Sequence, residues 1–307
     1  MNLSKKHIAV IAIIFVIAVI LSIFASVMLK NNIETGIWVK GNHMNDVNLD
    51  TLSENGVKDI FLHSSAVNLY NEENVSQWIK KANDKNITVH IWVQCFYSDN
   101  NWVNPINTTT EDYNYDFFNT KIDEIEKLAN IEGVGGIQLD YIRFPGNAYD
   151  YDYPNGVNSV GAVNKFVSMA SDKIKEVSRN KNKDLTISAV VMPERDNKKY
   201  YGQDVWTLSQ YVDVIVPMAY AGNYNVTESN ARAEWIKNTA IYFKETAIWS
   251  NVCIGIQTYE SDSVETPLSA SQLKKDSQAA LDGGANGIAL FPWELTKNWF
   301  NLNELQR

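Results

Sequence analysis

Several kinds of residue are scarce in this chain of 307 residues. Only two cysteines are present, Cys95 and Cys253. They cannot build the disulfide framework of a small secreted domain, and we expect both to be buried free thiols on opposite sides of the fold. Basic residues are also few, since 27 lysines and arginines accompany 36 acidic residues and the net charge is -9. A nucleic-acid partner is therefore not expected, because phosphate binding needs a basic surface.

Motifs of several large enzyme classes are missing. No glycine-rich turn of the dinucleotide-binding type follows a predicted strand, and no Gly-x-Ser-x-Gly sequence indicates a serine hydrolase. His63 and His90 lack the His-x-His or His-Glu-x-x-His spacing of a metal site. We assign both histidines a structural role and predict no metal and no other cofactor.

One long apolar run is present at the N-terminus. After Lys5 and Lys6, no charged residue occurs from Ile8 to Leu29, a length that can cross a membrane as a helix. We expect residues 1–30 to form an uncleaved transmembrane anchor; the alternative, a cleaved signal peptide, would have a shorter apolar run. Two lysines before the run and only Lys30 just after it predict a single-pass protein of the cell membrane whose bulk is extracytoplasmic.

Residues 31–307 show a regular alternation of strand and helix patterns without a linker. Helical spacing is clear in two segments: Phe118, Ile122, Ile125 and Leu128, and Val163, Phe166, Val167, Ala170, Ile174 and Val177. Runs rich in Val, Ile and aromatic residues predict eight strands, at Thr35–Lys40, Asp59–Ala66, Thr88–Phe96, Gly135–Phe144, Leu185–Pro193, Val212–Tyr220, Val252–Tyr259 and Gly287–Trp293. We therefore predict one α/β domain, a (β/α)8 TIM barrel, rather than an open doubly wound sheet, and we expect a monomer.

Alternation along each strand predicts which side chains enter the barrel. Helices cover the outer face, so polar residues of one parity point inward, and catalytic groups lie at the C-terminal ends of the strands. On the fourth strand this rule directs Gln138 and Asp140 inward, and on the fifth it selects Glu194. The other candidates for substrate binding are Trp38, Trp92, Gln94, Tyr220, Gln257, Tyr259 and Trp293.

The predicted barrel mouth combines aromatic rings, amides and two carboxyl groups. Aromatic faces stack on sugar rings, and amides and carboxylates bind hydroxyl groups. Most glycosidases need two carboxyl groups, and side chains on neighbouring strands start about 4.8 Å apart. We predict a glycosidase with Asp140 as nucleophile or base and Glu194 as proton donor, its pKa raised by an apolar environment.

Other readings of the same residues stay open. One alternative is a catalytically inactive carbohydrate-binding or surface-structural barrel, since a fold does not guarantee chemistry. A second is a metal-dependent glycan esterase or deacetylase. The loops Tyr97–Tyr113 and Pro145–Pro154 are expected to form the walls of the cleft, with tyrosines stacking on sugars. For Arg143 we expect a structural ion pair, with an anionic sugar as the alternative partner.

The fourth predicted strand carries a resemblance to a known family. Gly135-Gly-Ile-Gln-Leu-Asp-Tyr-Ile-Arg-Phe-Pro145 resembles the glycoside-hydrolase-like TIM-barrel families, whose pattern there is close to "EIQFDYIRFP", and Tyr211–Tyr220 is similar to their sixth strand. The resemblance implies a TIM barrel that acts on a polysaccharide or cell-surface glycan, with Asp140 as its catalytic residue. Met218-Ala-Tyr220 and Trp293 also resemble chitinase-type barrels, but these have a glutamate where this chain has Ile142. A chitinase mechanism is therefore not expected.

Overall fold

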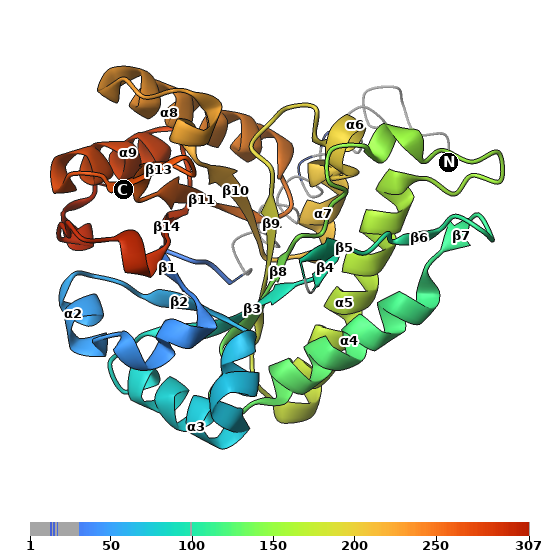
Figure 1. Cartoon of the computed structure of the whole chain (residues 1–307), viewed down its shortest axis with the longest axis horizontal. Helices are drawn as coiled ribbons and strands as arrows, with labels where there is room; N and C mark the ends of the chain where they lie inside the picture. Colours follow the sequence, from blue (N-terminus) through green and yellow to red (C-terminus); the bar gives the residue numbers. More distant parts are fainter. Residues whose placement is uncertain (1–12, 14, 16, 18–30, 99, 307) are drawn as a thin grey trace, which may run out of the picture.

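The computed structural model describes residues 13, 15, 17, 31–98 and 100–306. Eight parallel strands form a closed barrel in the order β1-β14-β11-β10-β9-β8-β3-β2. All of the strands predicted from the sequence are present, so the barrel architecture is confirmed (Figure 1). Their bounds are β1 Thr35–Val39, β2 Asp59–His63, β3 Thr88–Gln94, β8 Gly136–Asp140, β9 Thr186–Val191, β10 Val214–Ala219, β11 Asn251–Gln257 and β14 Gly287–Phe291.

Helices surround the strands on the outside (Figure 1). The predicted helical stripes of α4 and α5 are buried, and the side chains of Asn114 and Asn158 cap these two helices by accepting hydrogen bonds from the backbone N–H groups of Phe117 and Gly161. The helices are α2 Leu49–Glu54, α3 Ser65–Asn83, α4 Tyr115–Asn130, α5 Ser159–Lys181, α6 Asn197–Tyr201, α7 Val205–Tyr211, α8 Ser229–Thr246 and α9 Ala270–Asp282.

The closed sheet separates two apolar cores. Its interior is filled by Trp38, Phe61, Trp92, Val190, Val214, Val216, Cys253 and Ala289. Residues of the opposite parity, such as Ile37, Ile91 and Leu139, pack outward beneath the helices. Cys253 belongs to the interior and Cys95 to the outer layer, and both are buried free thiols, as predicted. The strands that carry or precede them, β11 and β3, lie on opposite sides of the barrel.

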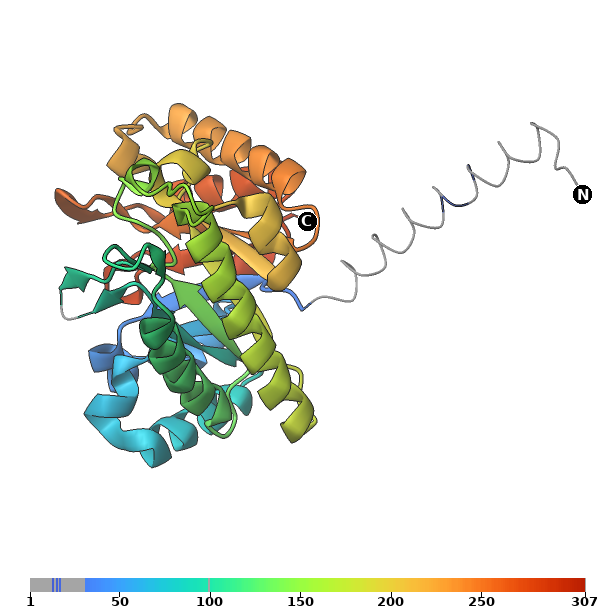
Figure 2. The same cartoon turned by 90° about the vertical axis from the view of Figure 1, so that its right-hand side faces the viewer.

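Short antiparallel hairpins extend the C-terminal end of the barrel. They pair β4 Tyr97–Ser98 with β5 Asn101–Trp102, β6 Ile106–Asn107 with β7 Asp112–Tyr113, and β12 Tyr259–Ser261 with β13 Val264–Pro267. Figure 2 shows the β4–β5 hairpin (teal) and the β12–β13 hairpin (dark orange) projecting on the side that faces the viewer in Figure 1. The loops that follow the barrel strands therefore gather on one face.

Residues 31 and 32 lead into the first strand at the other end of the barrel, where the strands begin. Asn251 Nδ2, at the start of β11, donates to the carbonyl of Asn31 at 3.0 Å, and Asn32 Nδ2 donates to the carbonyl of Asn286 at 3.4 Å, just before β14. None of the helices formed by the described residues has the length and apolar character needed to span a membrane. The predicted anchor, residues 1–30, lies outside the described residues apart from 13, 15 and 17.

Candidate active site

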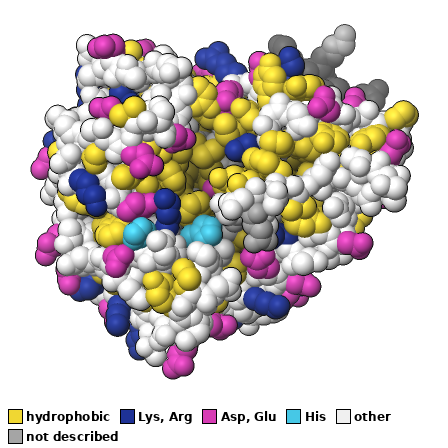
Figure 3. All heavy atoms as spheres, viewed as in Figure 1, with side chains coloured by type: hydrophobic (Ala, Val, Ile, Leu, Met, Phe, Trp, Pro, Cys, Tyr) yellow, Lys and Arg dark blue, Asp and Glu magenta, His cyan; other side chains and the backbone are white. Residues whose placement is uncertain are grey.

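A cavity of about 600 Å³ opens at the C-terminal ends of the barrel strands. Figure 3, which views this face, shows a hollow lined mainly by hydrophobic side chains, with charged side chains around it. Aromatic residues from β1, β3 and β14 contribute to the lining, together with Tyr220, which directly follows β10. The charged and amide side chains that line it are Lys40, Gln94, Asp140, Arg143, Glu194, Asn223 and Asp262.

Asp140 is the last residue of β8, and its carboxylate is held by two N–H donors. Trp92 Nε1 donates to Oδ2 at 2.8 Å, and the backbone N–H of Tyr141 donates to Oδ1 at 2.6 Å. The residue is only 7% exposed. Burial raises the pKa of Asp140 above the usual 3.8 and outweighs these hydrogen bonds and the charge of Arg143, which lower it. Asp140 can therefore keep a proton at a higher pH than an exposed aspartic acid can.

Glu194 follows β9 and is held by two phenols. Tyr201 and Tyr224 both donate to its Oε1, at 2.9 Å and 2.6 Å. Its Oε2 is buried and has no hydrogen-bond partner among the described residues. Burial and the bond to Glu194 raise the pKa of Tyr201 to about 12 and raise that of Tyr224 as well, so both phenols are donors at neutral pH.

A third carboxylate, Asp262, was not predicted from the sequence. It lies in the turn of the β12–β13 hairpin, where Tyr259 Oη donates to its Oδ1 at 2.5 Å. Asn223, in the 3₁₀ turn η3 (Ala221–Tyr224), fixes this hairpin: its Oδ1 accepts from the backbone N–H of Asp262 at 2.8 Å and from Gln257 Nε2 at 3.0 Å. A Cβ on Gly222 would lie 1.5 Å from the carbonyl oxygen of Glu260, so only glycine permits this close packing.

Aromatic rings form the floor of the cavity. Tyr220 stacks on Phe291, with ring centroids 5.3 Å apart and planes at 14°. Trp38 and Trp92 meet the same Phe291 ring edge to face, at 5.9 Å and 6.3 Å. Flat apolar surfaces beside a carboxylate are the features that hold a sugar ring.

A second group of rings surrounds Arg143 at one side. Tyr97 stacks on Tyr141 at 4.9 Å, and the guanidinium carbon of Arg143 lies 4.6 Å from the centre of the Trp102 ring. The expected ion pair of Arg143 is not formed, because no carboxylate of the described chain lies within 4.0 Å of its guanidinium nitrogens. Arg143 is instead held by cation–π contacts.

Most of the predicted site residues line this one cavity. They are Asp140, Glu194, Trp38, Trp92, Gln94, Tyr220 and Tyr259. Gln138, two residues before Asp140, is fully buried and accepts a 2.5 Å hydrogen bond from Trp38 Nε1. Gln257 is fully buried behind Asn223. Neither glutamine lines the cavity. The alternation rule predicts the direction of a side chain but not its depth in the barrel, so it did not exclude these two residues.

Trp293 also lies away from the cavity lining. The strand ends at Phe291, and Trp293 belongs to the 3₁₀ turn η4 (Trp293–Leu295), where its ring lies 5.8 Å from that of His43. Most of the functional residues that sequence reasoning missed follow strand ends, where alternation no longer applies. They are Lys40, Tyr141, Asn223, Tyr224 and Asp262; two others, Tyr201 and Phe291, end α6 and β14.

The Pro145–Pro154 loop does not form a wall of the cavity, contrary to the prediction. The ring of Tyr151 packs at 5.0 Å from that of Phe144, and the carbonyl of Tyr151 accepts from the backbone N–H of Ser159 at the start of α5. Tyr149 is 58% exposed and contacts the ring of Tyr200. The loop turns outward and packs on α5 and α6.

The two strand histidines contact neighbouring side chains of the barrel. His90 Nε2 lies 3.0 Å from a carboxylate oxygen of Asp59, deep in the barrel, and His63 Nδ1 lies 2.7 Å from Ser65 Oγ. Burial lowers the pKa of His63. Within the described ranges of the chain, no group of three or more His, Cys, Asp or Glu side chains is arranged to hold a metal ion.

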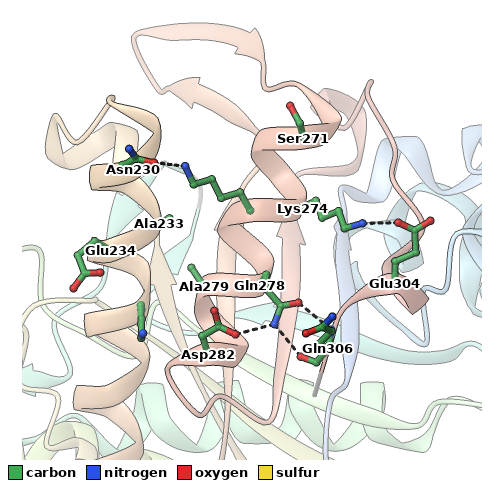
Figure 4. Close-up of a pocket in the computed structure, with 12 residues that line it drawn as sticks. Asn230, Ala233, Glu234, Ser271, Lys274, Gln278, Ala279, Asp282, Glu304 and Gln306 are labelled. Carbon is green, nitrogen blue, oxygen red and sulfur yellow. Dashed lines mark hydrogen bonds and ion pairs between the residues drawn. The ribbon is translucent and has the colours of Figure 1, made fainter.

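A larger cavity of about 750 Å³ lies on the flank of the barrel, between α8 and α9 (Figure 4). Its polar side chains bind one another: Lys274 pairs with Glu304 at 2.6 Å, and Gln278 Nε2 donates to Asp282 and to the carbonyl of Gln306 at 2.9 Å and 3.0 Å. It shares no lining residue with the cavity around Asp140. The cavity around Asp140 is therefore the better candidate for chemistry.

Comparisons with known proteins agree with this geometry. Among solved structures, the glycoside hydrolase domain of PgaB (BpsB) from Bordetella bronchiseptica is 11% identical, with a TM-score of 0.62 over 89% of this chain and 98% of that one. A glycoside hydrolase family 18 N-acetylglucosaminidase from Paenibacillus barengoltzii is 8% identical, with a TM-score of 0.62 over 89% and 99%. A class V chitinase from Pseudomonas fluorescens is 14% identical, with a TM-score of 0.61 over 88% and 97%. At such identities the likeness shows the fold.

The family is shown by a sequence match. No curated protein sequence matches the chain significantly. Residues 39–247, more than half of the chain, match the family model described as "Putative glycosyl hydrolase domain". With the barrel and its carboxylate-bearing cavity, this match shows that the chain belongs to that glycosyl hydrolase domain family.

Proposed function

We propose that this protein is a glycoside hydrolase that cleaves a polysaccharide or cell-surface glycan, with Asp140 and Glu194 as its catalytic carboxyl groups. One observation carries the proposal. A buried carboxyl group with a raised pKa ends β8 inside a cavity of about 600 Å³ that aromatic rings line, and a second carboxyl group, from the segment after the neighbouring strand β9, lines the same cavity. Most glycosidases use a pair of carboxyl groups in one cleft.

The surroundings of the two carboxyl groups favour a division of roles opposite to the one expected from the sequence. A general acid must hold a proton near the working pH, and burial raises the pKa of Asp140. Glu194 accepts two hydrogen bonds on Oε1, and these bonds fix the orientation of its carboxyl group for attack or proton transfer. Asp140 then protonates the leaving oxygen, while Glu194 attacks the anomeric carbon or takes a proton from the attacking water.

We also propose that residues 1–30 hold the barrel outside the cytoplasm, at the cell membrane. The support is the uncharged run from Ile8 to Leu29 and the lysines around it. A glycan of the cell surface is then within the protein's compartment. Protease accessibility of the barrel on intact cells tests this placement, and protection of the barrel in intact cells would contradict it.

The catalytic role of Asp140 is tested by Asp140→Asn in the purified full-length protein. We expect kcat/KM on a polysaccharide panel, measured from released reducing ends, to fall by roughly a thousand-fold, while glycan binding persists. Asp150→Asn is the matched control, because Asp150 is exposed and lies outside the cavity lining. Undiminished turnover by Asp140→Asn would overturn the proposal.

A second candidate function is glycan binding without cleavage. One observation favours it: Glu194 Oε1 is occupied by two phenols, and Oε2 is buried. A wild-type protein that binds glycans without releasing reducing ends, and an Asp140→Asn variant that binds them equally well, would establish this candidate in place of the first.

A further inference from the structure

We infer that Arg143 forms a subsite for an anionic group, a carboxylate or a phosphate, on the sugar that lies next to Asp140. The inference rests on the proposed function, because it specifies the class of glycan that the same cavity accepts, namely an acidic one. It follows from how the charges in the cavity are paired, which does not depend on the catalytic roles of Asp140 and Glu194.

The backbone directs Arg143 toward the cavity. Its two neighbours, Ile142 and Phe144, are buried among the outward-packed residues at 0% and 2% exposure, and the backbone N–H of Phe144 donates to the carbonyl of Tyr201 at 3.0 Å. Arg143 lies between these two anchored residues and lines the cavity together with Asp140. Its position is therefore fixed by the fold.

Three aromatic rings hold the guanidinium, and most of its N–H donors have no acceptor among the described residues. The guanidinium carbon lies 4.6 Å, 5.5 Å and 5.6 Å from the ring centres of Trp102, Tyr141 and Tyr201. One hydrogen bond within the described chain uses it, from Nη1 to the carbonyl of Phe144 at 3.2 Å. A guanidinium has five N–H groups, and a half-buried polar group is stable when its donors find acceptors. A ligand can supply these acceptors.

The carboxylates of the cavity use neutral donors and leave Arg143 without a carboxylate partner. Asp140 accepts from an indole and a backbone N–H, Glu194 accepts from two phenols, and Asp262 accepts from a phenol. The other cation of the lining, Lys40, already pairs with Glu294 at 2.6 Å. Among the described residues of this cavity, Arg143 is thus the cation without an ion pair.

A sugar acid matches this arrangement in shape and charge. The planar guanidinium binds the two oxygens of a carboxylate or phosphate side by side, and the adjacent rings provide surfaces on which a sugar stacks. Because the chain has a net charge of -9, long-range attraction does not select an acidic glycan. The selection must come from this short-range contact.

The test compares matched sugars on the full-length protein by titration calorimetry. N-acetylmuramic acid differs from N-acetylglucosamine by one carboxylate-bearing ether, and N-acetylglucosamine 6-phosphate differs from it by a phosphate. We expect at least one acidic sugar to bind wild type about ten-fold more tightly than the neutral sugar, and the one preferred identifies the anion. Arg143→Gln should remove this preference, and Arg143→Lys should keep only part of it.

Arg195→Gln is the matched control. Arg195 also packs on an aromatic ring, 5.2 Å from the centre of Tyr242, but it does not line the cavity, so the preference should persist in this variant. Equal binding of the three sugars by wild type, or no binding of any of them, overturns the inference. So does an equal loss of neutral and acidic binding in Arg143→Gln, which indicates that Arg143 only supports the aromatic rings.

The design separates this inference from the catalytic proposal. Binding requires no turnover, so a preference for acidic sugars in a protein that hydrolyses nothing refutes the proposed function and retains the subsite. Hydrolysis without a preference for acidic sugars supports the proposed function and refutes the subsite. Where Arg143→Gln fails to fold, as judged by circular dichroism, Arg143→Lys and the wild-type comparison decide the outcome.

Discussion

Asp140 and Glu194 are similar side chains with different surroundings. Asp140 is enclosed by the barrel and has a raised pKa, whereas Glu194 is oriented by two phenols that remain protonated at neutral pH. A pair of carboxyl groups in unlike environments is what acid and base roles in one site require. The neighbours of each residue, more than its own type, therefore determine its function.

Tyr224→Phe tests the support of Glu194. The change removes the 2.6 Å hydrogen bond to Oε1 but keeps the ring, which stacks on Trp235 at 5.2 Å. We expect kcat to fall about ten-fold with little change in KM, because one hydrogen bond to a charged group is lost. Steady-state kinetics measure the effect, with Tyr149→Phe as an exposed control. An unchanged kcat would show that Tyr224 contributes packing alone.

Single site residues were predictable only within the strands. Alternation correctly directed Asp140 and Trp92 into the barrel, because a regular strand fixes side-chain direction. It did not distinguish Asp140 from Gln138, which lies one layer deeper. It also gave no information about Asp262, because the position of a loop residue depends on contacts distant in the sequence.

At the scale of elements, η3 and the β12–β13 hairpin form one unit. Asn223 bonds both the hairpin and the end of β11, and Gly222 packs directly against the hairpin backbone. This unit places Tyr259 and Asp262 at the cavity. The hairpin therefore depends on a short turn that follows a different strand.

Asn223→Ala should uncouple this unit, because both hydrogen bonds of its Oδ1 are lost. We expect faster amide exchange in residues 259–267 and a several-fold higher KM, with the melting temperature changed little. Hydrogen-exchange mass spectrometry and kinetics measure these effects. Asn230→Ala on α8 is the control, and exchange rates that match wild type would contradict the coupling.

Long elements were predictable and short ones were not. The barrel strands and the stripes of α4 and α5 follow directly from residue periodicity. The hairpin strands β4 to β7 have two residues each, too few to show a period. The outward turn of the Pro145–Pro154 loop was not predictable either, because it depends on contacts with α5 and α6.

At the scale of the whole molecule, burial of Asp140 couples folding to pH. Its pKa is higher in the folded barrel than the usual 3.8, so between these values unfolding releases a proton and the free energy of unfolding falls as pH rises. The Asp140→Asn variant has no carboxyl group to titrate at this position. We expect its melting temperature to rise relative to that of wild type as pH rises from below 3.8 to 7. Thermal melts across this range measure the difference, and a constant gap would contradict it.

The entry of the chain at the base of the barrel limits the reach of the cavity. Strands of five to seven residues separate residues 31 and 32 from the open end, a height of roughly 20 Å at about 3.3 Å per residue. If residues 1–30 attach the barrel to the membrane, as we propose, the cavity would open on the side away from the membrane. Polymers lying flat on the membrane would then be out of reach, whereas glycan strands that rise from it, or belong to an adjacent layer, could enter the cavity.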